Sequence, residues 1–225
     1  TATDTNFSRD LNDYPGVVSY NGTIASFNQG RVSSKGWEAQ TGFDLSHYNY
    51  DYFYQKLGSP TGVNFDGRKP SSLTSYAPGD VTTSGGWSLV SSEKYIIFVN
   101  GNLTIRQKIT VANGGFLAFI VKGNITIDPN LGNNPASANR DNPVVEGVYI
   151  ADGTFKTSVG VSDHERFVGE GIFKAQRFLL ERDLGSGANG NGKYPAELFI
   201  FDPNLLFNSP KELWVSSMSW LEVAP

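Results

Sequence analysis

The chain has 225 residues, of which 39% are hydrophobic and 13% aromatic, so it can bury a sizeable core and is not predominantly disordered. Only 18% of the residues are charged, the formal net charge is −4, and lysine and arginine do not cluster, which excludes an electrostatic nucleic-acid surface. There is no cysteine, which excludes disulfides and cysteine nucleophiles, and no apolar run reaches the about 20 residues that a membrane span needs. Because the chain begins at Thr1 without a charged-then-apolar leader, we expect a processed product or an excised part of a longer chain.

Residues 1–85 are expected to cover or cap a repeat domain that follows them. Their clearest pattern is one short amphipathic helix at about 45–57, which has an aromatic face. The residues of this face are Tyr50, Phe53, Tyr54 and Leu57. Ser46 or Asp44 is the expected N-cap, and Gly58 followed by Pro60 ends the helix.

From residue 86 onward, an internal repeat predicts the fold. Residues 97–105 and 119–127 share the pattern Val-x-Gly-Asn-x-Thr-Ile, and looser copies occupy 149–157 and 167–175. Alternate residues of each copy are apolar or glycine, and self-similarity at about 20 residues is typical of stacked coils. The sequence therefore predicts an all-β chain, with a right-handed parallel β-helix over 86–225. In this register one inward file of side chains is formed by Val99, Val121, Ala151 and Gly169.

The outward side of each copy begins with a large apolar residue, and together these residues predict an apolar ridge. They are Phe98, Ile120, Ile150 and Val168. A ridge of this kind is an interaction surface unless something covers it, and we expect the helix at 45–57 to lie on it or to cap the N-terminal end of the solenoid.

The C-terminal segment 213–223 alternates like a strand and carries Trp214 and Trp220. Because large apolar groups occur on both of its faces, we interpret it as a strand that caps the solenoid. End-to-end self-association through the same residues is the alternative.

Asp152 and Glu170 come nearest to a catalytic pair. The predicted register places them about 5 Å apart, near the carboxylate spacing of retaining glycosidases. An ordinary surface ladder is the favoured explanation of these residues, since no sugar-stacking aromatic residue flanks them. The only histidines, His47 and His164, are not part of a recognisable triad.

Oxygen-bearing side chains around the polar insertion near 133–140 suggest calcium as an alternative to a metal-free loop. Asp128, Asn130 and Asp141 are the candidate ligands. Turn formation alone also explains them, and no EF-hand spacing is present. Four Asn-x-Ser/Thr triplets begin at Asn6, Asn21, Asn102 and Asn124. Glycosylation, chance, or an asparagine ladder between coils would account for the last two.

Several motifs carry a resemblance over about the last 140 residues. They are Gly-Asn-Ile-Thr-Ile at 123–127, Glu-Gly-Val-Tyr-Ile-Ala-Asp-Gly at 146–153, Gly-Glu-Gly at 169–171 and Trp-Leu-Glu-Val-Ala-Pro at 220–225. This stretch resembles the C-terminal β-helix region of large, uncharacterised secreted or surface-anchored bacterial proteins. Its coils are also similar in pattern to those of bactofilin-type polymerising solenoids. The resemblance implies an exported structural or adhesive role and supplies no catalytic residue.

The expected function is therefore that of a non-enzymatic, extracellular structural or adhesive module of a cell-surface or filament-forming protein. Its expected partners are further copies, joined through the solenoid ends, or a surface glycan, and it needs no cofactor. The alternative is a carbohydrate-binding or carbohydrate-cleaving β-helix that uses Asp152 and Glu170. Turnover of a polysaccharide that is lost when these carboxylates are replaced would identify the enzyme, whereas a scaffold would bind the polysaccharide without cleaving it.

Overall fold

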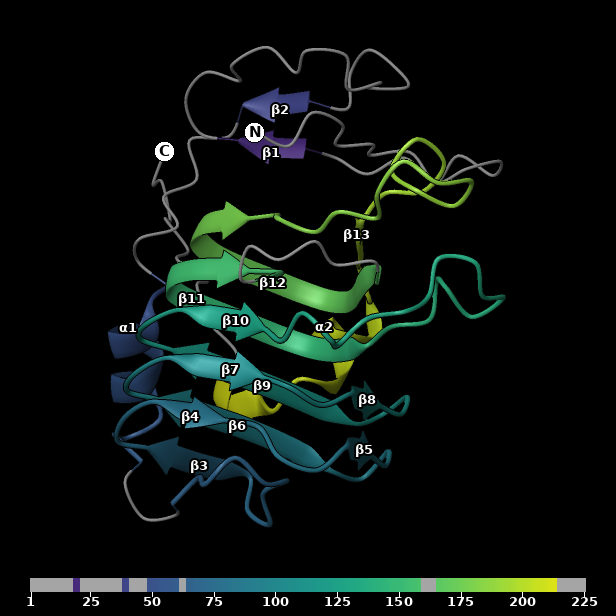
Figure 1. The fold of residues 1–225 in the computed structure, drawn as a ribbon. Helices are drawn as coiled ribbons and strands as arrows, with labels where there is room; N and C mark the ends of the chain where they lie inside the picture. Colours follow the sequence, from purple (N-terminus) through teal and green to yellow (C-terminus); the bar gives the residue numbers. More distant parts are fainter. Residues whose placement is uncertain (1–17, 21–37, 41–47, 61–63, 159–164, 214–225) are drawn as a thin grey trace, which may run out of the picture.

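The structure is a computed structural model that describes residues 18–20, 38–40, 48–60, 64–158 and 165–213. It is a parallel β-solenoid of about four turns, which confirms the predicted all-β fold class (Figure 1). Successive coils stack from β3 at one end to β13 at the other. A separate pair of short parallel strands, β1 (Val18–Tyr20) and β2 (Glu38–Gln40), precedes the solenoid in the chain.

Each coil has three sides, and each side is a parallel sheet. The first side contains β3 (Thr74–Ala77), β6 (Lys94–Val99) and β9 (Phe116–Val121). The second side contains β4 (Val81–Thr82), β7 (Leu103–Ile105) and β10 (Ile125–Ile127). The third side contains β5 (Trp87–Leu89), β8 (Ile109–Val111) and β13 (Glu197–Ile200). The long strands β11 (Val145–Lys156) and β12 (Phe167–Leu179) bend at two corners and contribute to all three sides.

The solenoid begins earlier than the predicted boundary at residue 86, because β3 and β4 already pair with the next coil. Phe65 closes the end of the solenoid that carries β3. Its N–H donates to the carbonyl of Tyr76 at 2.8 Å, and its ring packs edge-on against Trp87. Only 4% of Phe65 is exposed, so this segment belongs to the domain rather than to a separate covering region.

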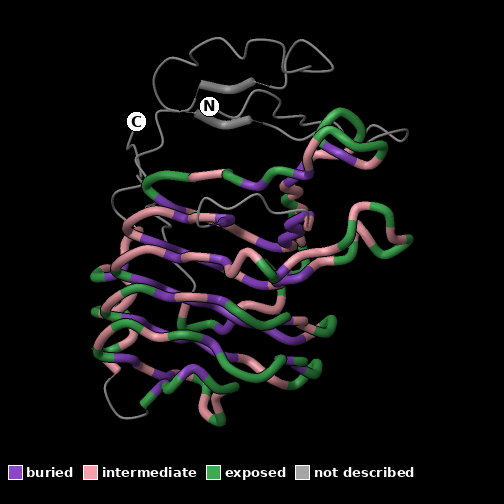
Figure 2. Tube along the Cα trace, viewed as in Figure 1, coloured by how far each residue is buried: buried purple, intermediate pink, exposed green. Residues whose placement is uncertain are grey.

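Alternate side chains fill the interior as the period of two predicts. Buried positions recur along each coil (Figure 2). Val99, Val121 and Ala151 pair in register on successive coils, and all three are fully buried. The fourth member of this file is Ala175 and not Gly169, because Tyr149 pairs with Phe173. The predicted register of the last coil is therefore wrong by six residues.

Stacked aromatic rings continue along the axis of the interior. Phe119 stacks on Trp87 with ring centroids 5.7 Å apart, Tyr149 stacks on Phe119 at 5.7 Å, and Phe173 stacks on Tyr149 at 5.2 Å. We call these four residues the aromatic stack. Offset stacking of buried rings adds to the stabilisation that comes from burial alone.

The corner between the first and second sides is built by a polar ladder. The Asn102 N–H donates to Asp80 Oδ1 at 2.7 Å, the Asn124 N–H to Asn102 Oδ1 at 2.9 Å, and the Thr154 N–H to Asn124 Oδ1 at 2.8 Å. A Cβ on Gly123 would lie 2.7 Å from the carbonyl oxygen of Gly101, so only glycine fits there. The repeated Gly-Asn pair is thus explained by stacking, which confirms the ladder interpretation of Asn102 and Asn124.

Replacing Asn124 with leucine is expected to lower the free energy of unfolding by about 1–2 kcal/mol, because the Thr154 N–H loses its acceptor. Asn124→Asp keeps an acceptor oxygen in the same place and should retain most of the stability. Urea denaturation of both variants measures the difference. Equal midpoints for the two variants would show that the ladder contributes nothing.

The predicted helix forms, although it is shorter than expected. Helix α1 (Tyr50–Lys56) begins after Asn49, whose side chain caps it by accepting the Tyr52 N–H at 2.9 Å. The proposed caps, Asp44 and Ser46, lie outside the described residues. The helix ends where Gly58 adopts a positive φ of 74°, as the Gly-Ser-Pro sequence predicts.

Helix α1 covers the apolar ridge, as the sequence predicts. The rings of Tyr50 and Tyr54 pack against Phe98 with centroids 5.7 and 5.5 Å apart. Phe98, Ile120 and Ile150 are buried beneath the helix and beneath Leu205 of α2 (Asn204–Asn208). The covered ridge is therefore not an open interaction surface.

Val168 is not a member of this ridge. Because of the corrected register, Lys174 occupies the position next to Ile150, and Val168 is buried where it pairs with Leu198 of β13. The predicted C-terminal cap strand at 213–223 lies outside the described residues except for Leu213, which ends a 3₁₀ turn, η2 (Lys211–Leu213), after α2. Trp214 and Trp220 lie outside the described residues.

Candidate functional site

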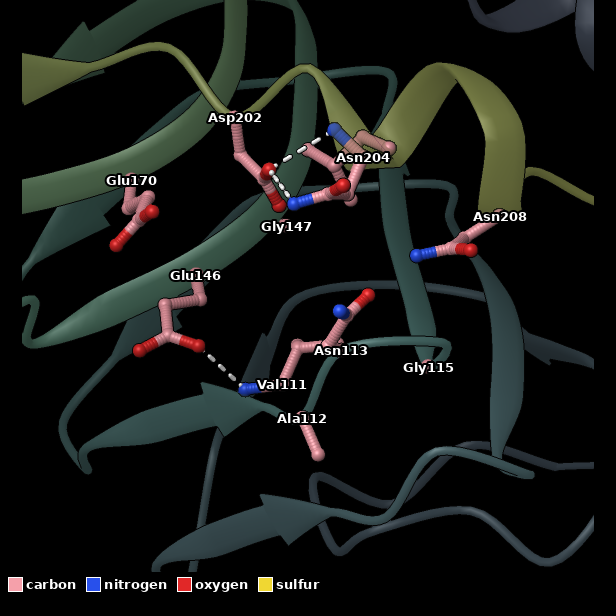
Figure 3. Close-up of a pocket in the computed structure, with 11 residues that line it drawn as sticks. Val111, Ala112, Asn113, Gly115, Glu146, Gly147, Glu170, Asp202, Asn204 and Asn208 are labelled. Carbon is pink, nitrogen blue, oxygen red and sulfur yellow. Dashed lines mark hydrogen bonds between the residues drawn. The ribbon is translucent and has the colours of Figure 1, made fainter.

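A pocket of about 210 Å³ lies between the third side of the solenoid and the segment that leads into α2 (Figure 3). We call it the acidic pocket, because three of its lining residues are carboxylates. Its polar lining residues are Asn113, Glu146, Glu170, Asp202, Asn204 and Asn208. Carboxylates and amides from four separate segments therefore converge on one small volume.

The acidic pocket results from a Glu-Gly pair that occurs in two successive coils. Glu146 of β11 and Glu170 of β12 are paired in register, and a glycine with positive φ follows each of them. A Cβ on Gly171 would overlap the carbonyl oxygen of Gly147, so the corner requires glycine in both coils. The two glutamates lie one above the other at the edge of the pocket (Figure 3).

The environment of the pocket favours the neutral forms of its glutamates. Partial burial raises the pKa of Glu146, which the nearby carboxylates of Glu170 and Asp202 raise further. The Val111 N–H, which donates to Glu146 at 2.6 Å, and Lys108 oppose this shift. Burial and then Asp202 raise the pKa of Glu170. Asp202 itself accepts two hydrogen bonds from Asn204, at 2.9 and 3.0 Å.

These shifts predict that the protein loses stability as the pH rises through the acidic range. A glutamate whose pKa is raised by folding binds more protons in the folded state than in the unfolded state. The free energy of unfolding therefore falls as the pH rises from the ordinary pKa of glutamate, about 4.3, to the raised pKa. Glu170→Gln should flatten this slope. Urea midpoints between about pH 4 and pH 7 measure it. Parallel curves for both proteins would contradict the expectation.

Asp152 and Glu170 do not form a pair, which corrects the predicted catalytic arrangement. Glu170 is the in-register neighbour of Glu146, because the last coil is offset by six residues from the predicted register. Asp152 instead anchors α1, and both of its oxygens lie 3.0 Å from the Tyr50 N–H. Burial raises the pKa of Asp152, while Lys174 and Lys122 oppose that shift.

Two carboxylates of the acidic pocket, Glu146 and Asp202, were not predicted as site residues from the sequence. The sequence does contain a signal for Glu146. Glu-Gly-Val-Tyr-Ile-Ala at 146–151 matches Glu-Gly-Ile-Phe-Lys-Ala at 170–175 better than the predicted copy at 149–157 matches the one at 167–175. No comparable signal marks Asp202, which folds back onto the pocket from beyond β13.

The residues considered for calcium are engaged in other interactions. Asp128 accepts two hydrogen bonds from Asn130 and lies 3.3 Å from the Arg106 guanidinium, and Asp141 is paired with the buried Arg166. Within the described residues, no group of three or more His, Cys, Asp or Glu is arranged to hold a metal ion.

A second feature is the corner between the second and third sides, which carries the longest connections. The connection from β10 to β11 (128–144) and the one from β12 to β13 (180–196) both leave the solenoid here and project to the same side in Figure 1. We call this place the loop corner, and the part of it between β11 and β12 is described only at 157–158 and 165–166.

Several predicted residues cannot be placed. His47, His164, Asn6 and Asn21 lie outside the described residues. Among the helices that the structure does describe, none combines the length and the apolar composition that crossing a bilayer requires.

The acidic pocket and the loop corner are thus the two candidate sites in the part of the chain that the structure describes. The resemblance to bacterial surface β-helices remains an expectation from the sequence. Comparisons of this chain with protein-family models, with curated proteins and with solved structures find no match.

Proposed function

We propose that the protein is a non-enzymatic, extracellular structural or adhesive module. The observation that carries this proposal is a rigid solenoid that holds two long polar loops at one corner. Its repeated side chains, including the polar ladder and the aromatic stack, join one coil to the next. Scaffolds of this kind commonly present binding residues on loops that a rigid core positions.

Immunogold labelling of native cells tests the location and the role together. Antibody against the whole chain is expected to label the surface of intact cells. Label that appears only after the cells are permeabilised would contradict an extracellular role.

Self-association through a solenoid end forms the second part of this proposal. At the end that carries β13, Phe178 and Phe199, whose rings contact the buried Phe155, are 40% and 36% exposed, whereas Phe65 closes the opposite end. Among the described strands, β13 pairs only with β12, which leaves one backbone edge unpaired. Light scattering during gel filtration should show a mass that grows with concentration, and Phe199→Asp should abolish this growth. A constant monomer mass would refute self-association.

The acidic pocket favours one further candidate function, which is cleavage of a glycan. Residues in register on neighbouring parallel strands lie about 4.8 Å apart, near the carboxylate separation of about 5–5.5 Å in retaining glycosidases. Glu146 is assigned the nucleophile, because the hydrogen bond that it accepts from the Val111 N–H favours its ionised form against the effect of burial on its pKa. Glu170, whose pKa is raised by burial, suits the acid. Three carboxylates would repel an acidic sugar, so the substrate would be neutral.

Release of reducing ends from neutral polysaccharides tests this candidate. If the pocket is catalytic, Glu146→Gln and Glu170→Gln should each abolish release, while Glu181→Gln, at an exposed position outside the pocket, should leave it unchanged. An absence of release by the native chain would leave the non-enzymatic role as the better explanation.

A further inference from the structure

We propose that the two described loops of the loop corner, 128–144 and 180–196, form a binding surface for a neutral polysaccharide. This inference rests on the adhesive function proposed above and names its site and its ligand class. The acidic pocket takes no part in it.

The loops at this corner are fixed by one buried arginine. Arg182, which is only 6% exposed, donates from all three nitrogens of its guanidinium to backbone carbonyls. Three of the acceptors belong to the base of the first loop, and two belong to the β11–β12 connection. The acceptors are the carbonyl oxygens of Asp128, Pro129, Leu131, Thr157 and Glu165. One side chain thereby holds together the loop corner in three successive coils.

The two loops also contact each other beyond their bases. The Arg140 guanidinium of the first loop lies over the Tyr194 ring of the second, 4.7 Å from its centroid. The first loop is held to the solenoid as well, because Asp141 is paired with Arg166 and Asn133 exchanges two backbone hydrogen bonds with Arg166. A surface of fixed shape loses less conformational entropy on binding than a mobile loop would.

Within the described residues, the exposed surface of the two loops is mostly polar, and its charged side chains, among them Glu181, Asp183 and Lys193, are of both signs. Its exposed side chains include Asn134, Asn139, Asn142, Ser186 and Asn191. Asp183 accepts hydrogen bonds from the Gly185 N–H and from Asn191, and Lys193 lies near the Tyr194 ring. A hollow of about 790 Å³ in the second loop is lined by Ser186, Asn191 and Lys193.

This chemistry selects one class of ligand. Amides and hydroxyls match the donors and acceptors of sugar hydroxyls. Among the described residues of the two loops, charges of both signs are mixed, so a charged polymer finds no patch of opposite sign. An apolar ligand finds no large apolar side chain among the exposed residues named above. A neutral polysaccharide, which presents hydroxyls at regular intervals, therefore fits best.

Biolayer interferometry with the full chain tests the proposal. The immobilised probes are a β-glucan, a mannan and a galactan, with hyaluronate and chitosan as charged polymers. The chain is expected to bind at least one neutral probe, and binding should survive about 1 M salt, which screens charge pairs. Binding to the charged polymers alone, lost in salt, would overturn the proposal.

A triple variant, Asn139→Ala, Asn142→Ala and Ser186→Ala, locates the site. These side chains are exposed and make no hydrogen bond within the described residues, so the fold should be unaffected. We expect an affinity loss of about tenfold or more, as the loss of about 1.4 kcal/mol of contacts would give. Gln176→Ala, an exposed amide on β12, is the matched control and should bind as the native chain does.

The outcomes separate this inference from the function on which it rests. If the triple variant binds as well as the native chain, the loop corner is not the site, although adhesion itself stands. If the native chain binds none of the polysaccharides but labels the cell surface, the ligand class is wrong. Absence of both binding and surface label would refute the adhesive function as well.

Discussion

Replacing Arg182 with methionine is expected to lower the free energy of unfolding by about 3–5 kcal/mol. Methionine fills a similar length but donates no hydrogen bond, so five backbone carbonyls at the loop corner lose a charged donor. Buried carbonyls that lose their partners bear the full cost of leaving water. The side chain is only 6% exposed, so solvent cannot readily replace the guanidinium.

Urea denaturation followed by circular dichroism measures this loss. Arg177→Met is the matched control, because Arg177 is exposed near the end of β12, shortly before Arg182 in the chain, and its replacement should change stability by no more than about 0.5 kcal/mol. Equal midpoints for the two variants would mean that Arg182 does not hold the corner together. Binding at the loop corner should weaken in parallel, since both loops depend on this residue.

The second large effect is expected at the centre of the aromatic stack. Phe119→Ala should lower the free energy of unfolding by about 3–5 kcal/mol, the range for removing a buried phenylalanine. Phe119 is fully buried between Trp87 and Tyr149, and the stacked coils leave little room for the cavity to collapse.

Phe207→Ala provides the control for this variant. Phe207 is 82% exposed on α2, and its loss should change stability by less than about 0.5 kcal/mol. Thermal unfolding should show a lower midpoint for Phe119→Ala alone. A small effect at Phe119 would indicate that neighbouring coils relax into the cavity, contrary to a rigid interior.

The fold was predictable because a period of two and a repeat of about 20 residues are both visible in the sequence. The placement of α1 was predictable for a similar reason, since the apolar ridge and the aromatic face of the helix could each be recognised. The N-cap was not, because Asp44, Ser46 and Asn49 are all good capping residues and the sequence does not rank them.

The register of the last coil could not be fixed by hydrophobic pattern. A shift of six residues is an even number, so it leaves every inward side chain pointing inward, whereas an odd shift would have turned the faces over. Phe167 and Phe173 are both inward aromatic residues, and either satisfies the pattern. Only the polar Glu-Gly pair at 146–147 and 170–171 distinguishes the two alignments.

The candidate site was therefore only half predictable. Glu170 was identified but was given the wrong partner, and Asp202 reaches the acidic pocket through a chain reversal that no local pattern marks. The suggested calcium ligands were misleading for a related reason. Arg106 and Arg166, which pair with Asp128 and Asp141, are distant in the sequence and meet them only through the coiling of the chain.

The two kinds of corner have different tolerances for foreign sequence. Between the first and second sides, two successive coils turn through a Gly-Asn pair whose side-chain oxygen accepts a backbone N–H of the next coil, so an inserted peptide would break that junction. Between the second and third sides, the spacer is only 106–108 in one coil but spans 128–144 in the next. An epitope grafted between Arg106 and Lys108 should therefore be displayed without harm to folding, which makes this protein a candidate carrier for peptides.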